Sequence, residues 1–203
     1  MSHYFINDDS LKDKEKIIHS EIQGVNLSFL SNSGVFSKDK VDYGTKLLLN
    51  SIDIDGMNGD VLDLGCGIGV IGITIKSKNN RVLVDMVDVN ERGINLSKYN
   101  MKLNRVNTNI FISDVYSNIN KKYDYIITNP PIRAGKKVVE GMIIGSYDYL
   151  KENGILYFVM RKDHGVKTLI KKLNVMFKVD VIERDKGFYI VKCVKIKKSK
   201  KSL

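Results

Sequence analysis

The sequence contains few of the residues that build a disulfide framework, a metal centre or a membrane segment. Two cysteines, Cys66 and Cys193, occur in the chain, and neither belongs to a CxxC motif or to a Cys/His cluster with metal-ligand spacing. There is no run of about 18 apolar residues, and the N-terminal residues lack the apolar segment of a signal peptide. We therefore expect a soluble, cytoplasmic protein in a reducing compartment, with no bound metal and no membrane contact.

Proline is almost as scarce as cysteine. The two prolines of the chain, Pro130 and Pro131, stand side by side in TNPPIR (128–133), directly after the apolar run YDYII. Because proline cannot donate to a strand ladder and fixes its own backbone angle, the pair predicts the end of a strand and a stiff turn. We therefore expect Asn129, at the head of this turn, to be held in a fixed position.

The formal charge is strongly positive, at +10, with 33 Lys and Arg against 23 Asp and Glu. Such an excess predicts a polyanionic partner, since Lys and Arg neutralise phosphates and release their counterions. An excess of Lys over Arg also follows from a biased genome composition, and part of the charge lies in the C-terminal KIKKSKKSL. Charge alone therefore leaves nucleic-acid binding open, and we expect residues 197–203 to form a basic, disordered tail.

From residue 60 onward, strand-like apolar runs alternate with helical patterns. This alternation predicts an α/β fold whose mostly parallel sheet has helices on both faces. The predicted strands span residues 60–65, 81–89, 109–113, 123–129, 154–160, 177–184 and 187–196. The predicted helices lie near residues 70–78, 91–104, 138–152 and 164–175.

The last two predicted strands are separated only by DKG, which is too short for a crossover helix. They must pair as an antiparallel hairpin, so one of the seven strands runs against the others. Upstream, two short strands around Gly24 predict a small hairpin, and KVDYGTKLLLNSI predicts a helix that leads into the first core strand. We therefore divide the chain into an N-terminal extension with a short hairpin (1–45), a single core (46–196) and the tail.

The stretch VLDLGCGIGVIGI (61–73) combines a strand, a glycine-dense turn and the start of a helix. Gly65, Gly67 and Gly69 permit a sharp turn and a close approach of a ligand, and the helix start offers free N–H groups. Nineteen residues past Gly69, Asp88 ends the second strand, where a carboxylate can accept hydrogen bonds from ribose hydroxyls. Together these features predict a site for a cofactor that contains a nucleoside.

Two classes of cofactor fit such a turn. Gly67, Gly69 and Gly72 match the GxGxxG of dinucleotide sites, but no acid–base set for hydride transfer follows. With Asp63 two residues before the turn, the stretch resembles motif I, D-x-G-x-G-x-G, of class I S-adenosylmethionine-dependent methyltransferases. The resemblance implies a Rossmann-like fold and S-adenosylmethionine as the cofactor. It also implies that Asp63 holds the ammonium group of the cofactor and that Asp114, just past the third strand, accepts from the adenine amine.

The turn TNPPIR ends the fourth predicted strand. If the chain crosses back after the third strand, the fourth lies beside the first and brings this turn next to the glycine turn. NPPI resembles motif IV of amino methyltransferases, in which the Asn129 side-chain oxygen and the Pro130 carbonyl would accept the two N–H groups of the target amine. The prolines would hold these acceptors fixed, so the contribution to catalysis is orientation and electrostatics. The catalytic residues implied are Asn129, Pro130, Pro131 and Ile132.

Upstream, SGVFSKDKVDYGTKLLL (33–49) adds a second resemblance. Combined with NPPI, it is similar to the small-domain methyltransferase family that includes the small-subunit rRNA guanine-N2 methyltransferases. The resemblance covers about residues 16–196, and it implies that Phe36 and the 42–45 segment close over the cofactor. The implied cofactor pocket consists of Phe36, Thr45, Asp63, Gly65, Cys66, Gly67, Gly69, Asp88, Val89, Asp114, Val115 and Asn129.

The implied substrate is an exocyclic amine of RNA, namely guanine N2 of small-subunit rRNA or of a ribosomal precursor. The base would have to be flipped out of its stack to reach the methyl group. Ile132 stands where many relatives carry an aromatic ring that stacks on the base, and Phe36 or Tyr43 are candidates to replace it. Basic residues at the same rim, which we expect to contact the RNA backbone, are Arg133, Lys136, Lys137, Arg161 and Lys162.

Two other functions remain open from the sequence. Protein glutamine methyltransferases also use an NPP motif, but Ile132 departs from their NPPY, and we expect no helical N-terminal domain of their kind. A nucleoside- or RNA-binding module that has lost catalysis is the second alternative. The presence of Asp63, Asp88 and Asn129 together argues against it.

Overall fold

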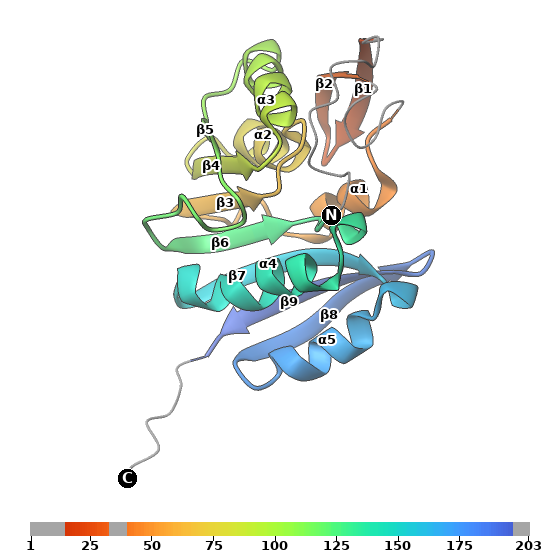
Figure 1. Cartoon of the computed structure of the whole chain (residues 1–203). Helices are drawn as coiled ribbons and strands as arrows, with labels where there is room; N and C mark the ends of the chain where they lie inside the picture. The colour runs from red at the N-terminus through yellow and green to blue at the C-terminus, as the bar shows by residue number, and fades with distance from the viewer. Residues whose placement is uncertain (1–14, 33–39, 197–203) are drawn as a thin grey trace.

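The computed structural model describes residues 15–32 and 40–196 (Figure 1). Its main sheet consists of β3 Asp60–Leu64, β4 Leu83–Asp88, β5 Asn109–Ile112, β6 Tyr123–Thr128, β7 Leu150–Arg161, β8 Phe177–Asp185 and β9 Phe188–Lys195. The helices are α1 Tyr43–Ser51, α2 Val70–Lys78, α3 Glu91–Leu103, α4 Lys136–Tyr149 and α5 Val166–Leu173, with short 3-10 turns η2 Ile132–Ala134 and η3 Lys162–His164. None of the helices in the described ranges is long and apolar enough to cross a membrane.

The strands are arranged in the order β5-β4-β3-β6-β7-β9-β8, which confirms the predicted seven-stranded mixed sheet. β9 runs antiparallel to its neighbours β7 and β8, whereas the remaining neighbours pair in parallel. β3 lies between β4 and β6, so the strand order reverses at β3, as predicted. The carboxyl ends of β3 and β6 therefore meet at the switch point where open sheets of this kind bind ligands.

The predicted boundary between α4 and the strand that follows it is wrong. The helix α4 ends at Tyr149 rather than at residue 152, because Leu150 already pairs with Tyr123 in the sheet. The register of β6 and β7 shifts between Tyr123 and Tyr125, and Asn153 of β7 has a φ of 59°. The pattern of apolar residues cannot separate a helix from a strand that follows it without a loop.

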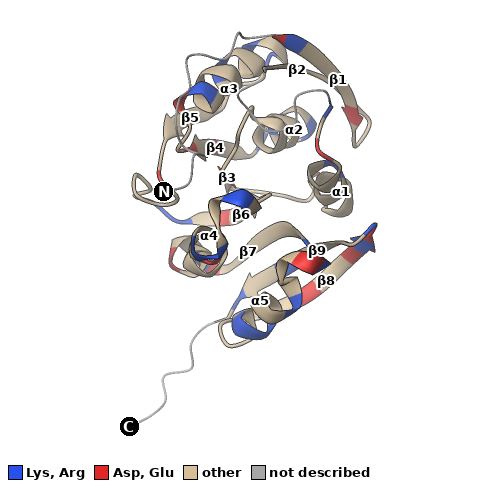
Figure 2. Cartoon of the chain, turned by 45° about the vertical axis from the view of Figure 1, so that its right-hand side comes forward, with Lys and Arg blue, Asp and Glu red and all other residues tan. Residues whose placement is uncertain are grey.

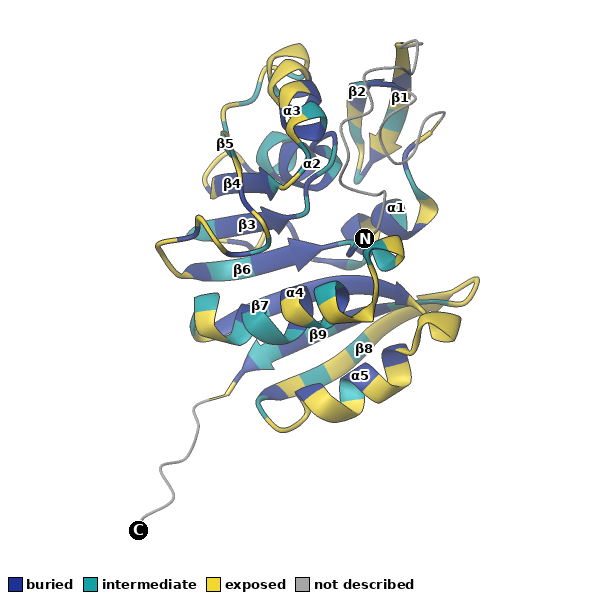
Figure 3. Cartoon of the chain, viewed as in Figure 1, coloured by how far each residue is buried: buried dark blue, intermediate teal, exposed yellow. Residues whose placement is uncertain are grey.

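Apolar side chains alternate along the strands and fill a core on each face of the sheet. Val61 of β3 packs on the side of α1, α2 and α3, whereas Leu62 packs on the side of α4 and α5. The central strands β3, β4 and β6 are mostly buried, whereas the edge strands β5 and β8 and the outer side of α5 are largely half-buried or exposed (Figure 3). Full burial of a Leu or Ile side chain contributes about 1.5–3 kcal/mol. The two cores thus fix the strand ends on which the candidate site is built.

The predicted N-terminal hairpin is present as a separate two-stranded sheet of β1 (Lys16–Ile22) and β2 (Val25–Ser31). Gln23 and Gly24 connect the strands with φ angles of 51° and 75°. Positive φ at both positions is typical of the tightest hairpin turns. The hairpin lies beside α2 and α3, on the α1 side of the main sheet (Figure 1).

Two asparagines, one in α3 and one at its C-cap, pair with the edge of β2 as a neighbouring strand would. Asn100 accepts from the N–H of Leu30 at 2.6 Å and donates to its carbonyl at 3.0 Å. Asn104 does the same with Ser28, at 3.0 and 2.7 Å. Asn100 also donates to the carbonyl of Ile68 in the glycine turn at 2.9 Å. The edge of β2 is therefore satisfied by side chains, and the hairpin is tied to the glycine turn.

Candidate functional site

The glycine turn joins β3 to α2 and approaches the end of β4. Gly65, Gly67 and Gly69 have φ angles of 75°, 54° and 90°, a region that other residues avoid. A Cβ atom on Gly69 would lie 2.7 Å from Cε of Met86, whereas one on Gly67 would meet nothing within 4 Å. The positive φ and the approach of Met86 both oppose a side chain at position 69, whereas Gly67 borders open space where a ligand can approach the backbone. Cys66, between Gly65 and Gly67, donates its backbone N–H to the carbonyl of Val87 at 2.9 Å.

Asp63 lies fully buried beneath this turn. Its Oδ2 accepts from the N–H of Gly72 at 2.8 Å, and its Oδ1 has no hydrogen-bond partner in the described part of the chain. Burial raises the pKa of Asp63 to about 7, the Gly72 hydrogen bond opposes the rise, and the negative charge of Asp88 adds to it. A buried carboxylate with an unpaired oxygen suits a cationic donor, so Asp63 fits the ammonium group of S-adenosylmethionine.

Asp88 ends β4 next to the glycine turn. Its Oδ2 accepts from the N–H of Gly67 at 2.8 Å and its Oδ1 from the N–H of Asn90 at 2.8 Å. Burial raises the pKa of Asp88, and the backbone hydrogen bonds oppose that rise. Each carboxylate oxygen retains a further lone pair, so this half-buried group can accept from ribose hydroxyls. Val89, which follows it, is exposed.

Asp114 and Val115 follow β5, the edge strand beside β4. Asp114 is exposed, and its backbone N–H donates to Oγ of Ser117 at 3.0 Å. Val115 has a φ of 51°, which is rare for a β-branched residue. Its carbonyl accepts from Oγ of Ser113 at 3.0 Å. The sequence carried no signal of this conformation, which places a strained residue beside the predicted adenine pocket.

The acceptor turn begins where β6 ends. Thr128 donates from Oγ1 to the carbonyl of Leu64 at 2.7 Å, which ties the ends of β6 and β3 together. The Asn129 amide nitrogen donates to Oδ2 of Asp42 at 3.0 Å and to Oγ1 of Thr45 at 2.8 Å. The oxygen of the same amide accepts from no described residue. The turn of α1 predicted to close over the cofactor thus holds Asn129 as well.

The rest of the NPPI motif turns away from the sheet. Pro130 is buried, Pro131 is half-buried, and the N–H of Ala134 donates to the Pro131 carbonyl at 2.9 Å. Ile132 begins η2 and packs, partly buried, against the core on the α4 side. Ile132 therefore contributes to packing, and an aromatic ring that stacks on a base would come from another element.

An aromatic pair stands at the start of α1. The rings of Tyr43 and Phe188 lie 5.7 Å apart, and the Tyr43 hydroxyl donates to Asp185. The guanidinium of Arg161 lies 5.4 Å from the Phe188 ring, and Nζ of Lys186 lies 4.6 Å from the Tyr43 ring. Sequence reasoning missed Phe188, because no motif connects the β8–β9 hairpin with α1. Phe36, the other aromatic candidate, lies outside the described residues.

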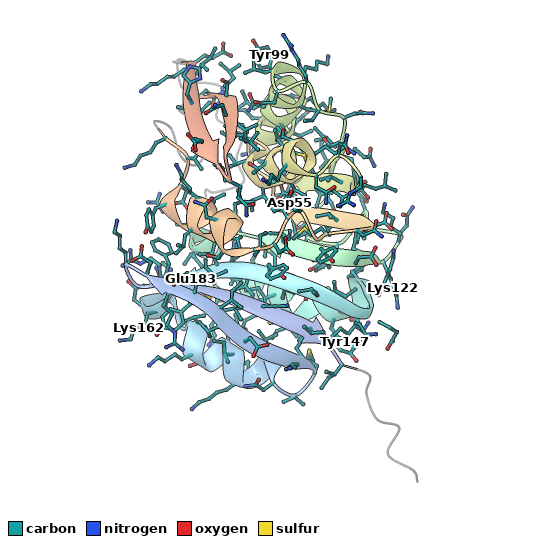
Figure 4. All side chains as sticks on the ribbon, turned by 180° about the vertical axis from the view of Figure 1, so that it is seen from behind. Asp55, Tyr99, Lys122, Tyr147, Lys162 and Glu183 are labelled. Atoms are coloured by element: carbon teal, nitrogen blue, oxygen red, sulfur yellow. The ribbon has the colours of Figure 1, made fainter. Side chains whose placement is uncertain are left out.

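The predicted basic residues follow the ends of two neighbouring strands. Arg133 in η2 and Lys136 and Lys137 at the start of α4 are exposed after β6, and Arg161 and Lys162 are exposed after β7 (Figure 2). Lys162 follows the end of β7, and Lys122 precedes the start of β6, so the two lie at opposite ends of the strands (Figure 4). No group of three or more potential metal-ligating side chains occurs within residues 15–32 and 40–196.

Comparison with known proteins places the chain in a family. The model of the methyltransferase small domain matches residues 26–192. The chain belongs to the methyltransferase small domain family. The resemblance drawn from the sequence is thereby confirmed, and with it the class of enzyme and S-adenosylmethionine as the cofactor of that class.

Relatives within this family include both short and long proteins. The chain is 39% identical over 198 residues to the uncharacterized protein YbxB of Bacillus subtilis, with 96% of the chain and 98% of that protein covered. It is 33% identical over 177 residues to ribosomal RNA small subunit methyltransferase C of Psychromonas ingrahamii, with 85% of the chain but 50% of that protein covered. The chain therefore spans about half the length of this longer relative.

Two solved structures support the fold. A 16S rRNA N2 guanine methyltransferase (RsmC) of Thermus thermophilus, solved with AdoMet and guanosine, superposes with a TM-score of 0.80 at 22% identity. The match covers 90% of the chain and 51% of that protein. A ribosomal protein L11 methylase of Lactobacillus delbrueckii gives a TM-score of 0.67 at 17% identity, with 79% and 87% covered. These likenesses confirm the Rossmann-like methyltransferase fold.

Proposed function

We propose that this chain transfers a methyl group from S-adenosylmethionine to an exocyclic amine of RNA, namely guanine N2 of small-subunit rRNA. Such a substrate would place the enzyme in the cytoplasm. The names of the longer relative and of the Thermus structure, both 16S or small-subunit rRNA methyltransferases, support this choice of substrate.

The observation that carries the proposal is the orientation of the Asn129 amide. Both of its N–H groups are directed inward to Asp42 and Thr45, which leaves its oxygen as the acceptor for a ligand. Asn129 follows the end of β6, which pairs in parallel with β3, the strand that carries Asp63. The acceptor for an amine and the carboxylate for the cofactor thus belong to adjacent strands.

The residues explain how a poor nucleophile can react. The lone pair of an exocyclic guanine amine is drawn into the ring, so the nitrogen attacks weakly. When bound, S-adenosylmethionine supplies an electrophilic methyl group on a sulfonium. The Asn129 oxygen and the Pro130 carbonyl would accept the two amine hydrogens, which directs the lone pair away from them and stabilises the positive charge that develops on nitrogen. Pro131 restricts the turn, so the acceptors need little reorganisation.

The exposed basic residues that follow β6 and β7 fit the sugar-phosphate backbone of an RNA substrate. Arg133, Lys136 and Lys137 follow the acceptor turn, and Arg161 and Lys162 follow the neighbouring strand. A phosphate backbone held there would present a flipped base to Asn129 without sequence-specific contacts. The exposed Tyr43 and its partner Phe188 offer an aromatic surface at the same rim.

The test is methyl transfer. The purified chain is incubated with methyl-labelled S-adenosylmethionine and either undermodified 16S rRNA, reconstituted small subunits or ribosomal proteins, and the labelled nucleoside is identified by mass spectrometry. We expect N2-methylguanosine. Label in glutamine would establish the protein methyltransferase instead, and no transfer to any substrate despite cofactor binding would establish a binding module.

Asn129→Ala tests the acceptor within that assay. Loss of one such electrostatic group lowers kcat by about 100- to 1,000-fold, and cofactor affinity should stay close to that of the wild type. Asn174→Ala, at the exposed end of α5, is the matched control and should keep the full rate. A full rate in Asn129→Ala would refute the acceptor role.

A further inference from the structure

We propose that Asp42 is a positioning residue that fixes which end of the Asn129 amide faces the substrate. The inference rests on the proposed function and deepens it. A side-chain amide has a donor end and an acceptor end of nearly equal size, and only the acceptor end can receive the N–H groups of an amine. The environment of Asn129 must therefore select one of two orientations.

The three side chains form a closed set of contacts. Asn129 Nδ2 lies 3.0 Å from Asp42 Oδ2 and 2.8 Å from Thr45 Oγ1. The Thr45 hydroxyl donates in turn to the same Asp42 oxygen at 3.4 Å. With its proton directed to Asp42, the hydroxyl oxygen is left to accept from Asn129. Asp42 is thus the final acceptor for both neighbours.

Asp42 decides the orientation because a carboxylate can only accept. A threonine hydroxyl could donate to the Asn129 oxygen if the amide were turned over, but Asp42 could not. Turning the amide would place its oxygen against the carboxylate and leave its N–H groups pointing to the substrate. The negative charge also strengthens the contact that holds the productive orientation.

The carboxylate itself is fixed by the start of α1. Asp42 is the N-cap of this helix, its Oδ2 accepts from the N–H of Thr45 at 3.0 Å, and its carbonyl accepts from the N–H of Lys46 at 3.0 Å. One carboxylate oxygen therefore caps α1 and orients Asn129. These two roles have different requirements of length, so substitutions can separate them.

Three variants of Asp42 separate its role as the helix cap from its role in orienting Asn129. Asp42→Ser supplies a cap as good as aspartate, but its shorter side chain does not reach Asn129, so we expect near-normal thermal stability and at least a tenfold lower kcat. Asp42→Asn keeps an acceptor of full length and should have a rate between those of the wild type and Asp42→Ser. Asp42→Ala should lose both stability and rate. Asp53→Asn, at an exposed turn, is the matched control for the loss of one charge.

A second measurement does not depend on turnover. The side-chain amide of Asn129, assigned by its disappearance in Asn129→Ala, should show protons in ¹H–¹⁵N spectra that exchange slowly with water in the wild type and in Asp42→Asn. In Asp42→Ser they should exchange several-fold faster. A purely structural role for Asp42 predicts that Asp42→Ser matches the wild type in rate and in amide exchange, and that result would overturn the proposal. If the wild type transfers no methyl group, the proposed function fails, whereas the exchange experiment still decides the role of Asp42.

Discussion

We expect the buried Asp63 to make stability and cofactor binding depend on pH in opposite directions. Its pKa of about 7 in the folded chain, against an ordinary value of 3.8, means that the fold favours the neutral form. Between these two values the unfolded chain is ionised at this position and the folded chain is not. The free energy of unfolding therefore falls as pH rises from about 4 to about 7 and levels off above that. Each tenfold change in the acid dissociation constant corresponds to ~1.4 kcal/mol, so the free energy of unfolding falls by about 4 kcal/mol in total.

Asp63→Asn isolates this effect. Asparagine keeps an acceptor for the N–H of Gly72 and cannot ionise, so the stability of the variant should lack this decline. Asp88, whose pKa burial also raises, is present in both proteins, so the difference between them reports mainly on Asp63. Urea unfolding at several pH values from 4.5 to 8 measures this difference in stability, which we expect to be on the order of a few kcal/mol. Asp53→Asn is the control for an exposed aspartate.

Cofactor binding should show the reverse dependence. The ammonium group of S-adenosylmethionine favours the ionised carboxylate, so binding releases a proton below about pH 7, and affinity should rise almost tenfold for each pH step of about 1. Calorimetry in two buffers of different ionisation enthalpy counts that proton. Asp63→Asn should bind weakly, without proton release in this range. If wild type and variant share one pH profile in both experiments, the assignment of Asp63 is refuted.

Two further sets of substitutions test the turn and the rim. Gly69→Ala should lower the free energy of unfolding by about 2 kcal/mol or more, because a positive φ and the contact with Met86 both oppose a side chain. Gly67→Ala should lower it less and should mainly abolish cofactor binding. Urea unfolding measures the first effect, and calorimetry measures the second. Equal effects of the two would contradict the open space assigned above Gly67. Arg133→Ala and Lys137→Ala should each weaken RNA binding and reduce the slope of log affinity against log salt by about 1; filter-binding titrations that show no change in slope would exclude phosphate contacts at these positions.

The sheet was predictable because its signals are local. Each strand of the core is a short apolar run bounded by turn residues, and connection length alone fixed the antiparallel direction of β9. The spacing of Asp63, the glycines and Asp88 was informative for the same reason, since parallel strands carry their ends to one edge. The boundary at Leu150 could not be predicted, because the helix and the strand meet without a turn between them.

The contacts between distant segments could not be read from the sequence. Asp42 and Asn129 are 87 positions apart, and Phe188 meets Tyr43 only because the β8–β9 hairpin returns toward α1. The positive φ of Val115 likewise has no residue signal, since valine normally avoids it. Motifs indicated which residues to expect in the site, whereas the packing of the chain decides how those residues orient one another.

The amides of Asn100 and Asn104 bear on how this protein can change over evolution. They hold β2 through the backbone of Ser28 and Leu30, so they place no demand on the outward side chains of those residues. The outward side chains of Ser28 and Leu30 are therefore free to change, whereas Leu27 and Phe29 beside them are buried in the core. The two asparagines are not free to change, because aspartate, leucine or serine at either position would leave a donor or an acceptor of β2 without a partner. Among relatives, an Asn-x-x-x-Asn at the end of this helix should persist beside hairpins whose outward residues differ.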